Sequence, residues 1–159
     1  MVGIIIASHG EFAKGILQSG SMIFGEQEDV KAVTLMPSEG PDDLRAKLQE
    51  AIASFSNQDQ VLFLVDLWGG TPFNQVNNLF EEHKDKWAIV AGLNLPMLIE
   101  AYASRLSMES AQEIAAHIID TAKEGLRFVL KNFNLRKLQR LLKQLHQLIL
   151  VNQVILITC

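Results

Sequence analysis

The sequence predicts an α/β protein built on a doubly wound, mainly parallel sheet. Four apolar runs are typical of strands, at 2–7, 30–35, 61–65 and 87–91. Stretches with helical periodicity lie between them. Because alternating strands and helices are typical of parallel strands joined by right-handed crossovers, we expect helices to cover the sheet.

The first helix is expected directly after the first strand. Ser8-His9-Gly10-Glu11 has the spacing of a capping box, in which Ser8 caps the helix and Glu11 reaches back. This places His9 at the carboxyl end of the first strand. The helix should run to about Phe24 and bury Phe12, Ile16 and Ile23.

Later elements follow the same alternation. Pro41 opens a helix whose apolar positions predict a buried face, a further helix covers about 72–82, and 92–96 turns into another. The last helix, 107–123, should bury Ile114, Ile118 and Ile119, and 126–130 is expected to be a fifth, edge strand. The buried face of the helix after Pro41 comprises Leu44, Leu48, Ala51, Ile52 and Phe55.

Composition indicates one globular domain with an atypical tail. Of 159 residues, 48% are apolar and 20% charged. Residues 1–130 hold all 18 acidic and nine of the 14 basic residues, whereas 131–159 carry five basic residues and no acid. We therefore expect a domain over 1–130 and a basic amphipathic helical tail over 131–159. The tail either binds a membrane surface or a partner groove, or is a non-native or out-of-frame extension.

The cysteine content and the N-terminus favour a cytoplasmic protein. Cys159 is the only cysteine, so no intrachain disulfide is possible. The first apolar run is too short for a signal peptide, and no run has the length of a membrane span. The net charge of −4 gives no indication of a nucleic-acid partner.

The most informative stretch is the third strand and the turn after it. Five apolar residues, 61–65, lead to Asp66, and then to Gly69, Gly70 and Thr71, with Pro72 starting a helix. Thr71 is the expected N-cap and Pro72 the first helical residue. Free amides at a helix N-terminus attract anions, so the turn is suited to phosphate.

Asp66 would repel a bare phosphate. It is therefore expected to pair with a cationic or N–H-bearing group that contacts the phosphate. Histidine fits this role, and His9 follows the first strand. If these two strands are neighbours, both side chains lie where ligands bind in such sheets, beyond the carboxyl ends at the reversal of strand order. Otherwise His9 is structural, and Asp66 only caps the following amides.

Other site classes find no support in the sequence. His83, His117 and His146 lack the spacing of metal ligands, and no dinucleotide fingerprint, phosphate-binding Walker loop, nucleophile elbow or zinc motif is present. We expect neither a metal nor a cofactor.

Three segments resemble a known family. Ile-Ile-Ile-Ala-Ser-His-Gly at 4–10, Phe-Leu-Val-Asp-Leu-Trp-Gly-Gly-Thr-Pro-Phe-Asn at 63–74 and Val-Ala-Gly-Leu-Asn-Leu-Pro-Met-Leu at 90–98 are similar to the IIA domain of the mannose-family sugar phosphotransferase system. The resemblance covers about 1–130. It implies that His9 is transiently phosphorylated, that Asp66 supports it, and that Thr71 lies at the phosphate site.

The resemblance also implies partners and a dimer. The donor would be the phosphocarrier HPr, the acceptor a IIB domain, and the wider system includes membrane IIC and IID components. An antiparallel edge strand, here 126–130, would be exchanged between the subunits of a homodimer. Amides of Gly69, Gly70, Thr71 and Phe73 are the expected phosphate contacts, and Trp68 and Phe12 the expected docking contacts. Members usually end after that strand or continue through a linker into a IIB domain; 131–159 resembles neither.

Three other functions stay open. One is the related phosphocarrier subunit of a dihydroxyacetone kinase system, although the Trp-Gly-Gly-Thr-Pro-Phe-Asn loop favours sugar transport. Another is a receiver-like domain phosphorylated on Asp66, which would need an acidic pair where this chain has Ser8-His9. The third is a binding module with an inert histidine.

Overall fold

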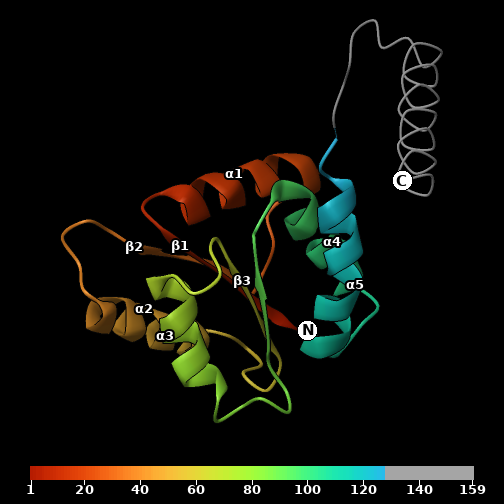
Figure 1. Cartoon of the computed structure of the whole chain (residues 1–159). Coiled ribbons are helices and arrows are strands. Elements are labelled where there is room, and N and C mark those ends of the chain that lie inside the picture. The colour runs from red at the N-terminus through yellow and green to blue at the C-terminus, as the bar shows by residue number, and fades with distance from the viewer. Residues whose placement is uncertain (128–159) are drawn as a thin grey trace, which may run out of the picture. The chain divides into compact units, whose positions relative to one another are not determined.

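The computed structural model describes residues 1–127 and consists there of alternating strands and helices (Figure 1). The expected tail over 131–159 and all but the first two residues of the expected edge strand over 126–130 lie outside the described residues. In chain order the elements are β1 (Gly3–His9), α1 (Phe12–Phe24), β2 (Val30–Leu35), α2 (Pro41–Ala53), β3 (Val61–Val65), α3 (Thr71–Phe80), β4 (Ala88–Ala91), α4 (Leu95–Ser104) and α5 (Ala111–Glu124).

The four strands form one parallel sheet in the order β2-β1-β3-β4. The chain first moves from β1 to β2 and then returns to add β3 on the other side of β1. Strand order therefore reverses between β1 and β3, where Ala7 lies opposite Val65. The prediction of a parallel α/β sheet is confirmed, and its reversal point joins the ends of the first and third strands.

Helices cover both faces of the sheet, with α1, α4 and α5 on one face and α2 and α3 on the other (Figure 1). Side chains alternate between these layers along each strand. In β3, Leu62 and Leu64 join the first layer, whereas Phe63 and Val65 join the second. Because both faces are covered, β3 is buried throughout, which explains its unbroken apolar run.

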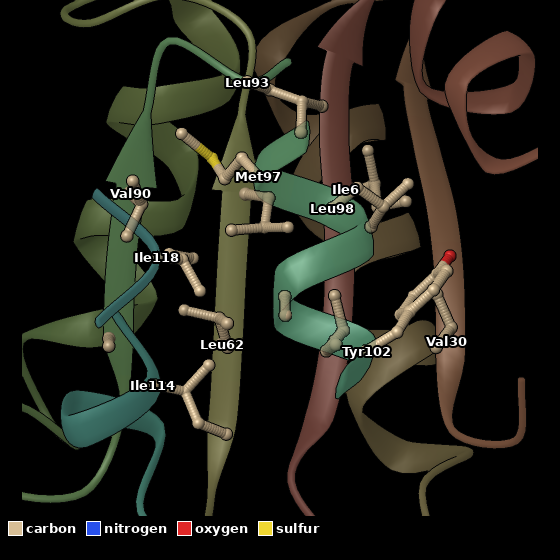
Figure 2. Close-up of a cluster of buried hydrophobic side chains, with 14 of the residues drawn as sticks. Ile6, Val30, Leu62, Val90, Leu93, Met97, Leu98, Tyr102, Ile114 and Ile118 are labelled. Atoms are coloured by element: carbon tan, nitrogen blue, oxygen red, sulfur yellow. The ribbon is translucent and has the colours of Figure 1, made fainter. Parts of the chain in front are cut away.

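The layer beneath α4 and α5 forms the larger cluster of buried residues (Figure 2). Leu98 and Tyr102 of α4 and Ile118 of α5 are fully buried against the strands. Gly20 of α1 brings that helix close to α4, since a Cβ at Gly20 would lie only 3.1 Å from Leu98 Cδ2 and from Tyr102 Cε2. Close packing here depends on the missing side chain.

The expected capping box at Ser8 is not formed. β1 continues through His9, which pairs with Leu35 of β2, so the helix begins only at Phe12. The Ser8 hydroxyl instead accepts a 2.7 Å hydrogen bond from the amide of Ala13, and Glu11 pairs with Lys14 at 3.1 Å. The strand ladder thus takes precedence over the local capping motif.

Three side chains expected to be buried are exposed. Phe12, Ile23 and Ile119 expose 46%, 62% and 40% of their surface. The buried residues of α1 are Ala13, Ile16 and Gly20, so the helix presents mainly small residues to the sheet and leaves Phe12 and Ile23 at its flanks. The other expected core positions are buried, namely Ile16, Leu44, Leu48, Ala51, Ile52, Phe55, Ile114 and Ile118.

The last helix is shorter than expected and begins at Ala111, where the Ser110 side chain accepts from the amide of Glu113. Within residues 1–127 no helix is both long enough and apolar enough to cross a bilayer.

We predict that Leu98→Ala lowers the free energy of unfolding by roughly 2–5 kcal/mol, because it opens a cavity in a fully buried site. Urea denaturation followed by circular dichroism measures the change. Met22→Ala is the control, since Met22 is 83% exposed and should change stability by less than about 0.5 kcal/mol. Equal effects of the two substitutions would contradict this core.

Candidate active site

His9 and Asp66 meet at the reversal point of the sheet. Asp66 Oδ2 accepts a 2.9 Å hydrogen bond from the backbone amide of His9 and lies 2.9 Å from Nδ1 of the same residue. Asp66 Oδ1 accepts from the amide of Leu67 at 2.8 Å. The juxtaposition predicted from the two strand ends is therefore present, and one carboxylate oxygen fixes both the backbone and the ring of His9.

These contacts determine the protonation of a neutral His9 ring. An ionised carboxylate can only accept hydrogen bonds, so the Nδ1 atom that contacts Asp66 must carry the proton. Nε2 then holds the lone pair. Among residues 1–127, Nε2 has no hydrogen-bond partner. The His9 side chain is 46% exposed, whereas that of Asp66 is only 17% exposed, so the ring faces solvent and the carboxylate that orients it is largely shielded.

The turn after Asp66 is shaped around the imidazole. Gly69 has a φ of +73°, in the left-handed region that favours glycine. A Cβ at Gly70 would lie 2.8 Å from Cε1 of His9, so the ring occupies the space of the missing side chain. Asn74 closes the turn, since its Nδ2 donates to the Gly69 carbonyl at 3.1 Å.

The helix after this turn starts one residue earlier than expected. Gly70 is the N-cap, Thr71 is the first helical residue and Pro72 the second, so the prediction that Thr71 caps the helix is wrong. The reason is that Gly70 already has the extended backbone of an N-cap (φ −70°, ψ 170°) and its carbonyl accepts from the amide of Asn74. α3 has no side-chain cap, unlike α4 and α5.

The uncapped N-terminus leaves donors next to His9. First-turn amides have no intrahelical acceptor, and Pro72 has no N–H, so within residues 1–127 the amides of Thr71 and Phe73 are the first-turn donors without an acceptor. The Gly70 amide differs, because it donates to the Leu67 carbonyl at 3.3 Å. The phosphate contacts expected of Gly69, Gly70, Thr71 and Phe73 stay predictions, and among them the Gly70 amide is already engaged.

Large apolar side chains surround the site. Trp68 is 74% exposed and its ring lies 4.4 Å from that of Phe73. Leu67 is 59% exposed and Phe12 46%. The sequence predicts Trp68 and Phe12 as docking contacts but not Leu67. The position of Leu67 directly after Asp66, in the turn at the site, is the signal that could have identified it. Contiguous exposed apolar side chains are typical of a protein-binding surface.

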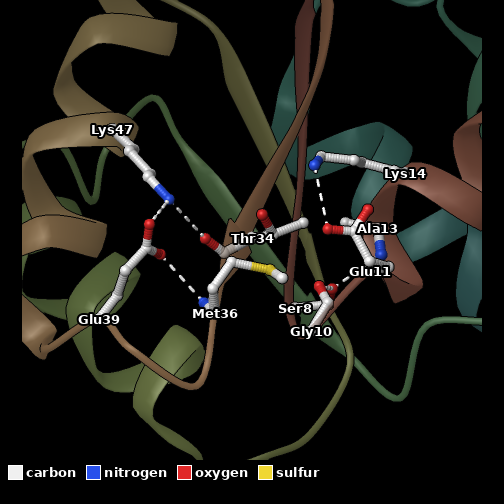
Figure 3. Close-up of polar contacts among 9 residues, drawn as sticks. All are labelled: Ser8, Gly10, Glu11, Ala13, Lys14, Thr34, Met36, Glu39 and Lys47. Carbon is white, nitrogen blue, oxygen red and sulfur yellow. Dashed lines mark hydrogen bonds and ion pairs between the residues drawn. The ribbon is translucent and has the colours of Figure 1, made fainter.

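A charged clamp holds the loop between β2 and α2 beside the site (Figure 3). Lys47 Nζ donates to Glu39 Oε1 at 2.5 Å and to the Thr34 carbonyl at 3.2 Å, while Glu39 Oε2 accepts from the Met36 amide at 3.0 Å. The adjoining end of β2 reaches the histidine turn, because the Leu35 carbonyl accepts from the Gly10 amide at 2.8 Å. The hydrogen bond from Lys47 lowers the pKa of Glu39.

The remaining described histidines have structural contacts. His83 stacks on Trp87, with ring centroids 4.0 Å apart, and His117 Nε2 lies 2.9 Å from Glu100 Oε1. In the described part of the chain, no three His, Cys, Asp or Glu side chains cluster as metal ligands would. His146 lies outside the described residues.

Comparison with known proteins identifies the family of the chain. The family model EIIA-man, described as the PTS system fructose IIA component, matches residues 3–119. The chain belongs to the EIIA family of the phosphotransferase system. The fructose-specific EIIA component of Bacillus subtilis is 37% identical over 105 residues, which are 66% of this chain and 71% of that protein.

Other EIIA proteins support the same assignment. The mannose-specific EIIAB component of Escherichia coli K12 is 35% identical over 126 residues, 79% of this chain, and this chain spans only 39% of that protein's length. The crystal structure of an EIIA component from Streptococcus agalactiae superposes with a TM-score of 0.75 at 38% identity, covering 80% of this chain and 97% of that one. A mannose/sorbose-specific IIA subunit from Enterococcus faecalis gives 0.73 at 32% identity, covering 84% and 98%.

For this EIIA chain we predict that Gly70→Ala folds but displaces the His9 ring from Asp66. The backbone of Gly70 suits alanine, so the contact with Cε1 is the main cost. Imidazole ¹⁵N and ¹H chemical shifts would report a weakened Nδ1 hydrogen bond. Gly15→Ala is the matched control, since a Cβ there meets open space; unchanged His9 shifts in Gly70→Ala would contradict the packing.

We also predict that the Glu39–Lys47 clamp no longer contributes to the stability of the folded protein in acid. A carboxyl group whose pKa is lowered on folding stabilises the folded state fully above its unfolded pKa of about 4.5. This stabilisation is lost as the pH falls through the lower pKa of the folded state. The difference in melting temperature between the unmodified chain and Glu39→Gln should therefore shrink between pH 6 and about pH 3. A difference that grows toward acid would refute this.

Proposed function

We propose that the chain is a phosphocarrier that accepts a phosphoryl group from phospho-HPr on His9 Nε2 and passes it to a IIB domain. The observation that carries this proposal is the 2.9 Å contact between Asp66 Oδ2 and His9 Nδ1, which leaves Nε2 as the exposed nucleophile. Membership of the EIIA family supports it.

The transfer step needs only two imidazoles. The Nε2 lone pair of His9 attacks the phosphorus of the donor phosphohistidine, and the donor N–P bond breaks with its electron pair returning to the donor ring. The proton on His9 Nδ1 stays in its hydrogen bond to Asp66. Transfer to the acceptor repeats these events with His9 as the leaving group.

The charges of the site match this step. The His9 ring becomes positive as the new bond forms, and Asp66 stabilises this charge from the Nδ1 side, away from the phosphoryl oxygens. Those oxygens would lie toward the α3 N-terminus, where the Thr71 and Phe73 amides and the helix dipole favour negative charge. The scheme requires no metal ion or cofactor.

Donor and acceptor would dock in turn on the apolar surface around His9. Trp68, Leu67 and Phe12 are its exposed members, and aromatic anchors are typical of binding hot spots. We further propose a homodimer that exchanges an edge strand over 126–130, with domain 1–130 as the phosphocarrier unit. The transported sugar and the membrane partners would be properties of the complete system.

We predict that His9→Ala abolishes phosphorylation by phosphoenolpyruvate, enzyme I and HPr, whereas Asp66→Asn folds and reacts roughly 10²-fold more slowly or worse. Both carboxylate oxygens of Asp66 accept hydrogen bonds, whereas an asparagine has only one side-chain oxygen. If that oxygen faces His9, the NH₂ group meets the Leu67 amide, which is also a donor. If it faces Leu67, the NH₂ group meets the His9 amide and favours the tautomer of His9 with an unprotonated Nδ1. Intact mass under alkaline conditions measures uptake, and rapid quench measures the rate.

Glu11→Gln is the matched control, because Glu11 lies beside His9 but contacts Lys14 rather than the ring. It should accept one phosphoryl group at close to the unmodified rate. A phosphorylated His9→Ala protein would overturn the assignment. Draining of the label by a dihydroxyacetone kinase subunit, and not by a IIB domain, would favour that related system.

A further inference from the structure

The turn after Asp66 contains one peptide whose orientation the site depends on, the peptide between Gly69 and Gly70. Glycine has no side chain to restrict its backbone, so two glycines in sequence allow this peptide many orientations. Gly69 has a φ of +73°, in the left-handed region. Gly70 is both the N-cap of α3 and the residue that packs against His9. The orientation of this peptide therefore has to be fixed by contacts.

Hydrogen bonds hold both polar groups of this peptide. The Gly69 carbonyl accepts from Asn74 Nδ2 at 3.1 Å, and the Gly70 amide donates to the Leu67 carbonyl at 3.3 Å. Because a trans peptide is planar and its C=O and N–H point in opposite directions, a contact that fixes the carbonyl also fixes the amide. The Leu67 contact lies within the turn, whereas Asn74 belongs to α3. Asn74 thus ties the turn to the helix.

The stability of α3 does not explain an asparagine at position 74. Asn74 is the fourth residue of the helix and is exposed to solvent. Its backbone amide already donates to the Gly70 carbonyl at 2.9 Å, as any residue could there. Asparagine forms helices less well than alanine, so alanine at this position would favour the helix. The Asn74 side chain therefore serves the turn rather than the helix.

The position of Gly70 affects two parts of the candidate active site. A Cβ at Gly70 would lie 2.8 Å from His9 Cε1, so a shift of Gly70 changes the space in which the ring lies. Gly70 also directly precedes Thr71, whose amide is a first-turn donor next to His9. A rotation of the Gly69–Gly70 peptide would therefore move the imidazole and the Thr71 amide relative to each other.

We propose that Asn74 is a positioning residue for phosphoryl transfer, which acts through the Gly69–Gly70 peptide and does not touch the phosphoryl group. Its Nδ2 keeps the Gly69 carbonyl, which would repel phosphoryl oxygens, directed toward α3, and it holds Gly70 in place against the His9 ring. This role rests on the phosphocarrier function proposed above. It concerns the rate of the transfer step and not the docking of the donor.

The test is Asn74→Ala in the full chain, with phosphoryl uptake from phospho-HPr measured by rapid quench over a range of donor concentrations. We expect kcat to fall roughly tenfold and KM to change by less than about twofold, because the lost hydrogen bond misplaces groups that act during transfer. The melting temperature should stay within about 3 °C of that of the unmodified chain, since alanine favours the helix.

A second variant and a matched control accompany this substitution. Asn74→Asp has the same shape but offers no donor to the Gly69 carbonyl and adds a negative charge, so its kcat should be lower still. A carboxylate in the first turns of a helix suits the helix dipole, so this loss would not reflect unfolding. Asn78→Ala is the control, because Asn78 is exposed one turn further along α3. Its kcat should stay within about twofold of the unmodified value.

Chemical shifts give a readout that does not require transfer. In the unphosphorylated ¹⁵N-labelled chain, Asn74→Ala should move the His9 imidazole signals, whereas Asn78→Ala should not. The proposal is overturned if kcat of Asn74→Ala equals that of Asn78→Ala, if only KM changes, or if the His9 signals stay in place. If the unmodified chain accepts no phosphoryl group, the proposed function itself fails, and the role of Asn74 in transfer fails with it.

Discussion

The candidate active site depends on one carboxylate oxygen. Asp66 Oδ2 contacts both the backbone amide and Nδ1 of His9, and so joins the ends of β1 and β3 to the orientation of the imidazole. This is possible only because the two strands are paired in a fixed register, with Ala7 opposite Val65 and the Asp66 amide donating to the Ala7 carbonyl at 3.2 Å. Register is in turn held by side chains buried on both faces. Core packing thus positions the His9 ring.

The same constraint determines what can follow Asp66. The chain must leave the sheet immediately, without covering Nε2, and then start a helix whose first turn lies beside the ring. Gly69 provides the positive φ, and Gly70 leaves the space that the imidazole fills. This turn leaves the side chains of Leu67 and Trp68 exposed to solvent. Exposure of large apolar side chains is unfavourable in a protein that binds no partner. Their exposure makes sense if this surface is covered during function.

Much of this arrangement was readable from the sequence because strong signals coincided. The wholly buried β3 followed by Asp66, and β1 followed by His9, identified both strand ends, and alternating elements implied the parallel sheet that unites them. Local cap signals were less reliable: Ser8 and Thr71 have capping chemistry, but strand pairing and the backbone of Gly70 moved both helix starts. Phe12 and Ile23 failed as core predictions since helical periodicity alone does not say which apolar residues meet the sheet.

Contacts between distant segments were beyond sequence reasoning. The Glu39–Lys47 clamp and the burial of Arg105 against Val2 and Gln27 require the fold, because nothing local distinguishes these charged residues from solvated ones. Arg105 in particular lies in the turn after α4, where an exposed side chain is the ordinary expectation. Its burial depends on acceptors from segments that lie far away in the sequence.

The N-terminus of α3 combines an open first turn with a position next to the His9 ring. α4 and α5 have side-chain caps from Asn94 and Ser110, each of which satisfies a first-turn amide, whereas the N-cap residues of α1, α2 and α3 make no side-chain cap hydrogen bond. A glycine at the N-cap costs a helix only about a few tenths of a kcal/mol relative to a polar cap. At α3, a side-chain cap would occupy a donor that an incoming phosphoryl group needs in the proposed reaction. Gly70 therefore leaves the amides open at little cost in stability.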